Sequence, residues 1–182
     1  QTYWLNQQHS SGGFGYVAGN LPSGSMTCAG ISSLIIVEEN LGETLPVVNG
    51  RLQCCSPQDD SIALRRAIEF WGTRFAARFN PTGPNDVGKH YLFYYLYGVE
   101  RAGRLSGRRF FGDHDWYREG VDYLLQRQQP VSGAWVGASQ IAEAQGEIAT
   151  SFALLFLSKG RWPVVAAKYE YGTDRQWDQN PK

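Results

Sequence analysis

One short pattern occurs twice in this chain, once near its start and once in its last third. Each copy has a glutamine, a glycine four positions later and an aromatic residue two positions after that glycine: Gln8, Gly12 and Phe14, then Gln129, Gly133 and Trp135. Glycine permits a tight reversal of the backbone, and an aromatic ring can cover the junction that results. A glutamine side chain can bond the backbone groups that helix ends leave unpaired. The pattern therefore predicts one kind of turn, used twice.

The segments beside these turns have the periodicity of two kinds of helix. Residues 61–79 and 116–128 set apolar side chains opposite charged ones, as in a helix with one buried face. Residues 25–40, 90–103 and 147–160 are apolar around most of their circumference, which indicates buried helices. With the end of a helix at 3–8, the order outer helix, glycine-rich turn, buried helix occurs three times. A repeat of this size predicts an all-α fold of helical hairpins in a solenoid or toroid.

The ends of these helices can be assigned from the residues that cap helices. Serine and aspartate side chains accept hydrogen bonds from the first backbone N–H groups of a helix, and glycine is common where a helix ends. In the middle repeat, at 79–85, only Gly83 keeps the spacing of the repeated pattern. The expected caps are Ser23 or Ser25 for the helix at 25–40, Asp59, Asp60 or Ser61 for the next, Asp115 for the helix at 116–128, and Gly103 and Gly160 as the ends of the second and third buried helices.

Composition excludes some classes of partner. Charged residues make up 19% of the chain and the formal net charge is zero, so we expect no binding to nucleic acid or to an anionic membrane. The longest apolar run, at 151–157, falls far short of the ~20 residues that span a bilayer. Aromatic residues reach 14%, which suits either a packed core or a pocket for an apolar ligand.

The repeated pattern also resembles a known family motif. The sequence EGVDYLLQRQQPVSGAW at 119–135 resembles the QW motif of squalene–hopene and oxidosqualene cyclases, and WLNQQHSSGGF at 4–14 resembles it with phenylalanine for tryptophan. Residues 1–160 are similar to the prenyltransferase/squalene-cyclase-like α/α toroid superfamily. The segments GSMTCAGISSL, HYLFYYLYGVERAGRLSGRRFFGDHDWYREG and ATSFALLFLSKGR are most similar to the toroid region of large exported bacterial proteins of unassigned function.

This resemblance implies a fold, a domain division and a cellular location. The implied fold is part of an α/α toroid, like terpenoid cyclases and protein prenyltransferases, over residues 1–162, with 163–182 as a tail or linker. A closed toroid needs about twice the helices found here. The chain would then be half a barrel or an open arc, with its edges covered by the remainder of a parent chain or by a second copy. The resemblance also implies a bacterial protein that is exported or periplasmic.

The catalytic residues of that superfamily are matched only in part. Class II terpenoid cyclases use an acid held in a DxDD motif, and this motif is absent from the chain. The most similar segments, at 58–60 and 113–115, precede predicted helices, where aspartate is an ordinary N-terminal cap. Prenyltransferases hold zinc with Asp, Cys and His at the starts of inner helices. Cys28 and His90 occupy such starts, with Glu147 at the third, but Met26 stands at the place of the family's Asp. The alternative is that Cys28 packs as a small apolar residue while His90 and Glu147 cap helices or meet solvent.

Two further clusters are candidate binding residues. Tyr91, Tyr94 and Tyr95, with Glu147, are candidates for a cavity that holds an isoprenoid-like or sugar ligand; alternatively, their hydroxyl groups are bonded between helices in a filled core. The loop at 104–118 combines arginines with aromatic residues, the composition of interface hot spots. Asp113 and Asp115 would otherwise neutralise it internally. The partner-surface candidates in this loop are Arg108, Arg109, Phe111 and Trp116.

The three cysteines allow two predictions about their oxidation state. Cys28 would pair with Cys54 or Cys55 in an oxidising compartment, or all three are free thiols. We expect an interaction or apolar-ligand-binding module of a larger bacterial protein, with no resident cofactor and no identified catalytic residue. The alternative is a fragment of an isoprenoid-processing enzyme, either cyclase-like or a zinc prenyltransferase.

Overall fold

A computed structural model describes residues 2–41, 47–48, 51–52, 60–82, 91–138 and 142–158 of the chain. This part is mostly helical, as expected. Its helices are α1 (Thr2–Gln7), α2 (Gly24–Leu41), α3 (Ile62–Gly72), α4 (Leu92–Leu105), α5 (Trp116–Arg127) and α6 (Gly146–Leu157), with a single 3-10 turn, η1 (Ala142–Ala144). Two antiparallel ribbons pair β1 (Val47–Val48) with β2 (Arg51–Leu52), and β3 (Phe110–Phe111) with β4 (His114–Asp115). No described helix is long and apolar enough to cross a membrane.

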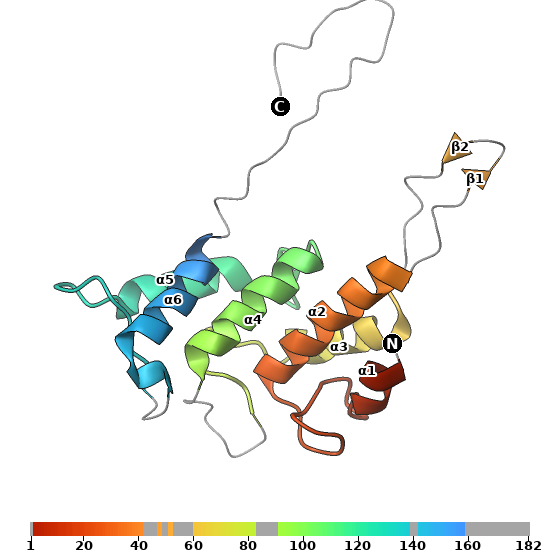
Figure 1. Cartoon of the computed structure of the whole chain (residues 1–182), viewed down its shortest axis with the longest axis horizontal. Helices are drawn as coiled ribbons and strands as arrows, with labels where there is room; N and C mark the ends of the chain where they lie inside the picture. Colours follow the sequence, from red (N-terminus) through yellow and green to blue (C-terminus); the bar gives the residue numbers. More distant parts are fainter. Residues whose placement is uncertain are drawn as a thin grey trace, which may run out of the picture.

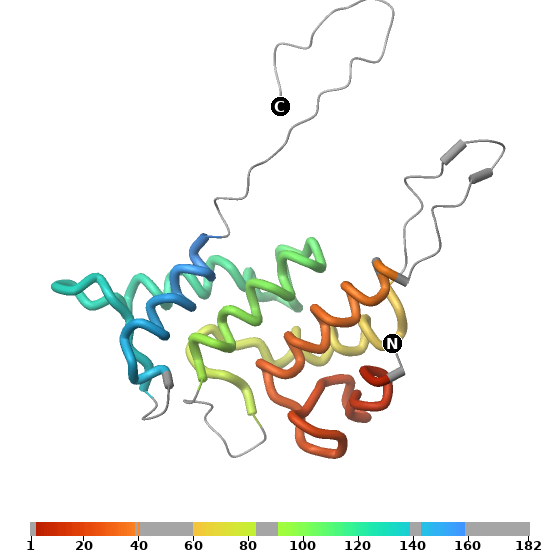
Figure 2. The backbone as a smooth tube through the Cα atoms, in the orientation of Figure 1, coloured from red at the N-terminus to blue at the C-terminus, as the bar shows by residue number. Residues whose placement is uncertain are grey.

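The helices form two layers. Helices α2, α4 and α6 lie side by side and run in the same direction, while α3 and α5 run back behind them (Figure 1). Helix α4 packs between α2 and α6, α3 packs on α2, and α5 packs on α4. The colours of Figure 2 show that the chain alternates between the two layers, from an outer helix to an inner helix and back again. Successive helical hairpins therefore lie next to each other. We call α2, α4 and α6 the inner helices and α1, α3 and α5 the outer helices.

Large aromatic side chains fill the space between the layers. Trp71 of α3 and Trp116 of α5 are fully buried, and the Trp71 ring lies 4.2 Å from the ring of Phe111. Each burial of this kind contributes about 2–3 kcal/mol. Their indole N–H groups are also satisfied, since Trp71 Nε1 donates to the Tyr95 hydroxyl at 3.3 Å and Trp116 Nε1 donates to the Arg108 carbonyl at 2.8 Å.

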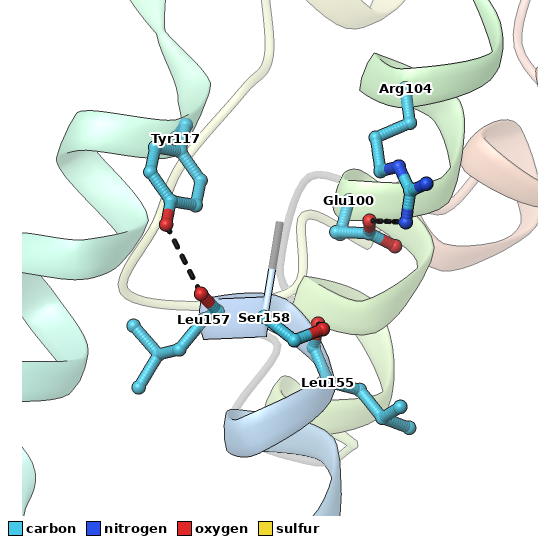
Figure 3. A network of polar contacts seen from close by, with 6 residues as sticks. All are labelled: Glu100, Arg104, Tyr117, Leu155, Leu157 and Ser158. Atoms are coloured by element: carbon cyan, nitrogen blue, oxygen red, sulfur yellow. Dashed lines mark hydrogen bonds and ion pairs between the residues drawn. The ribbon is translucent and has the colours of Figure 1, made fainter. Parts of the chain in front are cut away.

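A second set of contacts fixes the end of the inner layer. Figure 3 shows Tyr117 of α5 pointing at the last turn of α6, where its hydroxyl donates to the Leu157 carbonyl at 3.2 Å. The same view shows Arg104 reaching back one turn of α4 to Glu100, at 3.0 Å. Glu100 is buried, so this ion pair satisfies a carboxylate that has little access to water.

The predicted caps of both amphipathic helices are confirmed. Ser61 Oγ accepts a hydrogen bond from the Leu64 N–H at 3.2 Å, and Asp115 Oδ1 accepts one from the Arg118 N–H at 3.2 Å. At α2, Ser23 Oγ accepts from the Met26 N–H at 3.2 Å. These side chains satisfy N–H groups that a helix start leaves unpaired.

Two predicted helix ends are wrong. Helix α3 ends at Gly72 instead of near residue 79, and at this end Thr73 Oγ1 donates to the Phe70 carbonyl at 2.9 Å. The backbone of Gly72 also packs directly against Gly112, since a Cβ at Gly72 would lie 2.7 Å from the Gly112 nitrogen. Gly103 does not end the second inner helix, which continues to Leu105. It lies instead where the Trp116 ring crosses α4, so its lack of a side chain serves packing rather than termination.

We predict that Gly103→Ala destabilises the protein. The new Cβ would lie 2.2 Å from the buried Trp116 ring, and overpacking of this kind costs about 1–3 kcal/mol, against a gain of about 1 kcal/mol in helix propensity. Gly146→Ala at the start of α6 is the matched control, because its Cβ would lie 3.8 Å from the Trp135 carbonyl oxygen and from the Val136 side chain, an ordinary contact distance. Thermal unfolding should show a lower Tm for Gly103→Ala alone; equal shifts in both variants would contradict the packing role.

Candidate functional site

The first copy of the repeated pattern closes a tight turn between α1 and α2. Gly12 has φ +102°, and a Cβ there would lie 2.5 Å from the Arg66 carbonyl oxygen. Gln8 Nε2 donates to the carbonyls of Gly12 at 2.7 Å and of Ala63 at 2.8 Å. Phe14 is fully buried. The glutamine therefore ties the turn to helix α3, while the phenylalanine fills the space under it.

The second copy makes a similar turn between α5 and α6. Gly133 has φ +68°, and its N–H donates to the Gln129 carbonyl at 2.8 Å. The Gln129 side chain accepts a hydrogen bond from Ser132, and the carbonyl of Gly133 is instead bonded by the neighbouring Gln128 Nε2 at 2.9 Å. The buried Trp135 donates its indole N–H to the Leu124 carbonyl in the last turn of α5, at 2.8 Å.

The two copies share one anchoring contact. The backbone N–H of Phe14 donates to Thr27 Oγ1 at 3.1 Å, and the backbone N–H of Trp135 donates to Thr150 Oγ1 at 3.0 Å. Both threonines lie in the first two turns of the inner helix that follows. The expectation that the glutamines bond helix ends is wrong in detail: glutamines bond the turns and α3, and in the second copy the tryptophan bonds the helix end.

The starts of two inner helices are capped by the following hairpin. At α2, Asn80 Oδ1 accepts from the Ser25 N–H at 3.0 Å, and the Pro81 carbonyl accepts from the Gly24 N–H at 2.6 Å. Asn80 is buried and its amide group donates to Ser25 Oγ at 3.2 Å. These residues follow α3, so the second hairpin supplies the cap of the first inner helix.

Glu143 does the same for helix α4. The helix begins after Tyr91, which has φ +57° and provides no side-chain cap. Glu143, which follows α5, is buried, and its Oε1 accepts from the Tyr94 N–H at 2.8 Å. Burial raises the pKa of Glu143 above its ordinary value of 4.5, and the backbone N–H groups of Tyr94, Phe93 and Leu92 act against that rise. Its local sequence gives no sign of this role, because the helix that it caps is distant in the chain.

The predicted cavity residues lie in different environments. Tyr95 is fully buried between α4 and α3, bonded to Trp71, so it matches the alternative of a filled core. Burial raises the pKa of the Tyr95 hydroxyl well above its ordinary value. Tyr94 and Tyr91 are partly exposed, and Glu147 is exposed in the first turn of α6. Of these four residues, Tyr94 is the one that lines the groove between α2 and α4, and its side chain is partly exposed there.

The predicted metal ligands do not form a described site. Cys28 is a free, fully buried thiol, and burial raises its pKa well above the ordinary value. His90, Cys54 and Cys55 lie outside the described residues, as do residues 159–182. Within the described ranges, no group of three His, Cys, Asp or Glu side chains is placed to hold a metal ion. The described residues that remain from the proposed set, Cys28 and Glu147, give no support to the zinc prenyltransferase alternative.

The predicted partner surface at 104–118 is wrong for its aromatic members. Phe111 and Trp116 are fully buried in the core between the layers. Arg109 forms an ion pair with Asp115 at 3.0 Å, and the Arg108 side chain pairs with Asp60 near the start of α3. Asp115 therefore neutralises one arginine of the loop, as the alternative expected, while Asp60, outside the loop, pairs with another. In strand β3 the side chain of Phe111 is buried and that of Phe110 is half-exposed, because successive side chains of a strand point to opposite faces.

The uncovered side of the inner layer carries an exposed apolar stripe. Ile36 of α2, Tyr94 of α4 and Leu155 of α6 expose 39%, 42% and 47% of their surface. Phe152 of α6 packs on the α4 tyrosines, with its ring centroid 5.8 Å from that of Tyr94 and 5.5 Å from that of Tyr97, and Ile36 lines a groove together with the same two tyrosines. We call these five residues the inner-face stripe.

Two hollows open on the described surface. A groove of about 210 Å³ lies between α2 and α4, beside the inner-face stripe, and is lined by residues that include Cys28, Ser32, Tyr94, Tyr97 and Arg101. A hollow of about 380 Å³ lies on the outer layer and is lined by α5 and the segment after α3, with charged side chains at Arg78, Glu119 and Asp122. The groove is the better candidate site because aromatic and small side chains line it, with a single charge.

Comparison with protein-family models, curated proteins and solved structures gives no match.

We predict that Trp135→Phe lowers the free energy of unfolding by about 1 kcal/mol. The ring would still fill the junction, but the hydrogen bond to the Leu124 carbonyl would be lost. Trp4→Phe is the matched control, because Trp4 packs edge-on against Phe14 and its indole N–H makes no hydrogen bond with a described residue. Urea denaturation measures both; a loss as large in Trp4→Phe would assign the effect to ring size.

We predict that Glu143→Gln changes how stability depends on pH. A carboxyl whose pKa is raised by folding stabilises the folded state below its ordinary pKa, and this contribution is lost as pH rises through the folded value. The wild type should therefore lose stability relative to Glu143→Gln as pH rises above about 4.5, the ordinary pKa of the group. Glutamine keeps the acceptor for the Tyr94 N–H, whereas Glu143→Ala should cost about 1–3 kcal/mol throughout. Urea denaturation at several pH values tests this; parallel profiles of wild type and Glu143→Gln would contradict it.

Proposed function

We propose that this chain is a helical repeat module of the α/α toroid kind that acts by binding an apolar ligand on the inner-face stripe. The observation that carries the proposal is the exposure of apolar side chains from three neighbouring helices on one side of one layer. Isolated exposed apolar residues are ordinary, but a contiguous patch marks a binding surface. In a toroid, this side of the inner layer would face the central cavity.

The titratable groups near the stripe favour binding over catalysis. General acid–base or nucleophilic catalysis needs groups that converge on one reacting position. Among the described residues, the Cys28 thiol is buried and its pKa is raised, so its reactive thiolate is disfavoured. The raised-pKa carboxyl of Glu143 is occupied with the N-terminus of α4. Arg101 is the one charged residue that lines the described groove.

The start of α6, compared with the starts of α2 and α4, supports the idea of an incomplete arc. Asn80 and Glu143 cap α2 and α4 from the following hairpin, whereas Gln145 begins α6 with no side-chain hydrogen bond from any described residue. Leu154 on this helix is 56% exposed. We propose that a further hairpin, from the remainder of a parent chain or from a second copy, covers this end. From the resemblance of the sequence, we propose that this parent chain is an exported bacterial protein.

We predict that the chain binds Nile red, a neutral apolar dye, in a saturable manner. Leu155→Glu places a charge in the stripe and should weaken binding about tenfold. Ile62→Glu is the matched control, because Ile62 is 71% exposed on the outer helix α3. Fluorescence titration measures both, with circular dichroism confirming that the variants fold. Equal affinity in the two variants, or no saturable binding by the wild type, would overturn the proposal.

A further inference from the structure

The groove between α2 and α4 exists because the two helices approach closely over small residues. Gly98 of α4 faces Cys28 of α2, and a Cβ at Gly98 would lie 3.3 Å from the Cys28 Cβ. Ala29 lies beside this contact and also lines the groove. The larger side chains of Tyr94, Tyr97 and Ile36 stand around these small ones, so that a hollow of about 210 Å³ remains between them.

The floor of the groove contains a polar atom without a partner. Ser32 is only 9% exposed, and its Oγ makes no hydrogen bond in the described part of the chain. A serine within a helix commonly bonds the carbonyl one turn earlier, as Ser151 Oγ does to the Glu147 carbonyl at 2.7 Å. Ser32 lines the groove and its hydroxyl is unbonded but enclosed, so a rotation of the side chain about χ1 would present that hydroxyl to a molecule bound there.

The positively charged side chain of Arg101 lines the groove at the same level as Ser32. Helices α2 and α4 run in the same direction, and Cys28 faces Gly98. One helical turn later, Ser32 and Arg101 are therefore neighbours across the groove. Arg101 forms no ion pair with a described residue, whereas Arg104, Arg108 and Arg109 are each paired with a carboxylate.

We propose that this groove binds a small aromatic carboxylate. The ring would lie against Tyr94, Tyr97 and Ile36, with its edges near the two tyrosine rings. The carboxylate would accept two hydrogen bonds from the planar guanidinium of Arg101 and one from the Ser32 hydroxyl. This proposal rests on the proposed function in using the same face, and adds a defined position and a charge requirement.

The size of the groove sets the size of the ligand. Pockets for drug-sized molecules measure about 300–1,000 Å³, so a groove of about 210 Å³ suits a single ring with a short acidic arm. Phenylacetate, with about ten non-hydrogen atoms, is a suitable probe, and a molecule of that size is expected to bind in the millimolar range. Phenylacetamide has the same shape without the charge.

The experiment is a titration of the ¹⁵N-labelled full chain with phenylacetate and with phenylacetamide, followed by backbone amide spectra. Phenylacetate should shift the amides of Ser32, Gly98 and Arg101 saturably, and phenylacetamide should bind about tenfold more weakly. Arg101→Gln should reduce phenylacetate affinity about tenfold and leave phenylacetamide affinity unchanged. Arg65→Gln, on the exposed face of α3, is the matched control.

A second variant separates the hydroxyl from the charge. Ser32→Ala should weaken phenylacetate about fivefold without lowering Tm, because it removes a buried hydroxyl that has no partner in the free protein. Equal affinity for phenylacetate and phenylacetamide, or no loss in Arg101→Gln, would overturn the carboxylate site. Absence of saturable shifts with either probe would also overturn it. In each case Nile red binding still judges the proposed function separately.

Discussion

The buried starts of the inner helices need hydrogen-bond acceptors, and in this chain the acceptors come from the next hairpin. The first N–H groups of a helix have no partner within it, and a buried helix start cannot rely on water. At α4, Tyr91 contributes no cap, so the Glu143 carboxylate meets the Tyr94 N–H from across the layer. At α2, Asn80 and the Pro81 carbonyl add to the local cap from Ser23. The second and third hairpins therefore stabilise α2 and α4, the inner helices before them.

This arrangement couples the spacing of the inner layer to the turns between layers. The segment that carries each cap follows an outer helix and precedes the next inner one, so it fixes two neighbouring inner helices at once. The repeated turns add a second link, since Phe14 and Trp135 each bond a threonine on the inner helix that follows. The two acceptors differ in their energetic cost: the Asn80 amide is neutral, whereas burial penalises the charge of Glu143.

Local sequence predicted the features that depend on neighbours in the chain. Helical periodicity located the inner helices, and Ser61 and Asp115 were identifiable as caps because they lie next to the helices that they serve. The cross-hairpin caps were missed because Asn80 and Glu143 lie 55 and 49 residues from their partners. Phe111 and Trp116 were misassigned to the surface for the same reason: Trp71, Phe156 and other residues that bury them are distant in sequence. Periodicity also cannot separate Tyr94 from Tyr95, since Tyr95 is buried by its packing against α3 and the start of α2.

The candidate site follows from covering the inner layer on one side only. The outer helices bury one face of each inner helix, and the opposite face keeps Ile36, Tyr94 and Leu155 in contact with solvent. Where α2 and α4 approach through Gly98 and Cys28, the small side chains that permit the approach also leave a hollow that the tyrosines cannot fill. The same feature that holds the layer together therefore creates its groove. A ligand there would contact two helices whose spacing the cross-hairpin caps already fix, so little ordering of the protein would oppose binding.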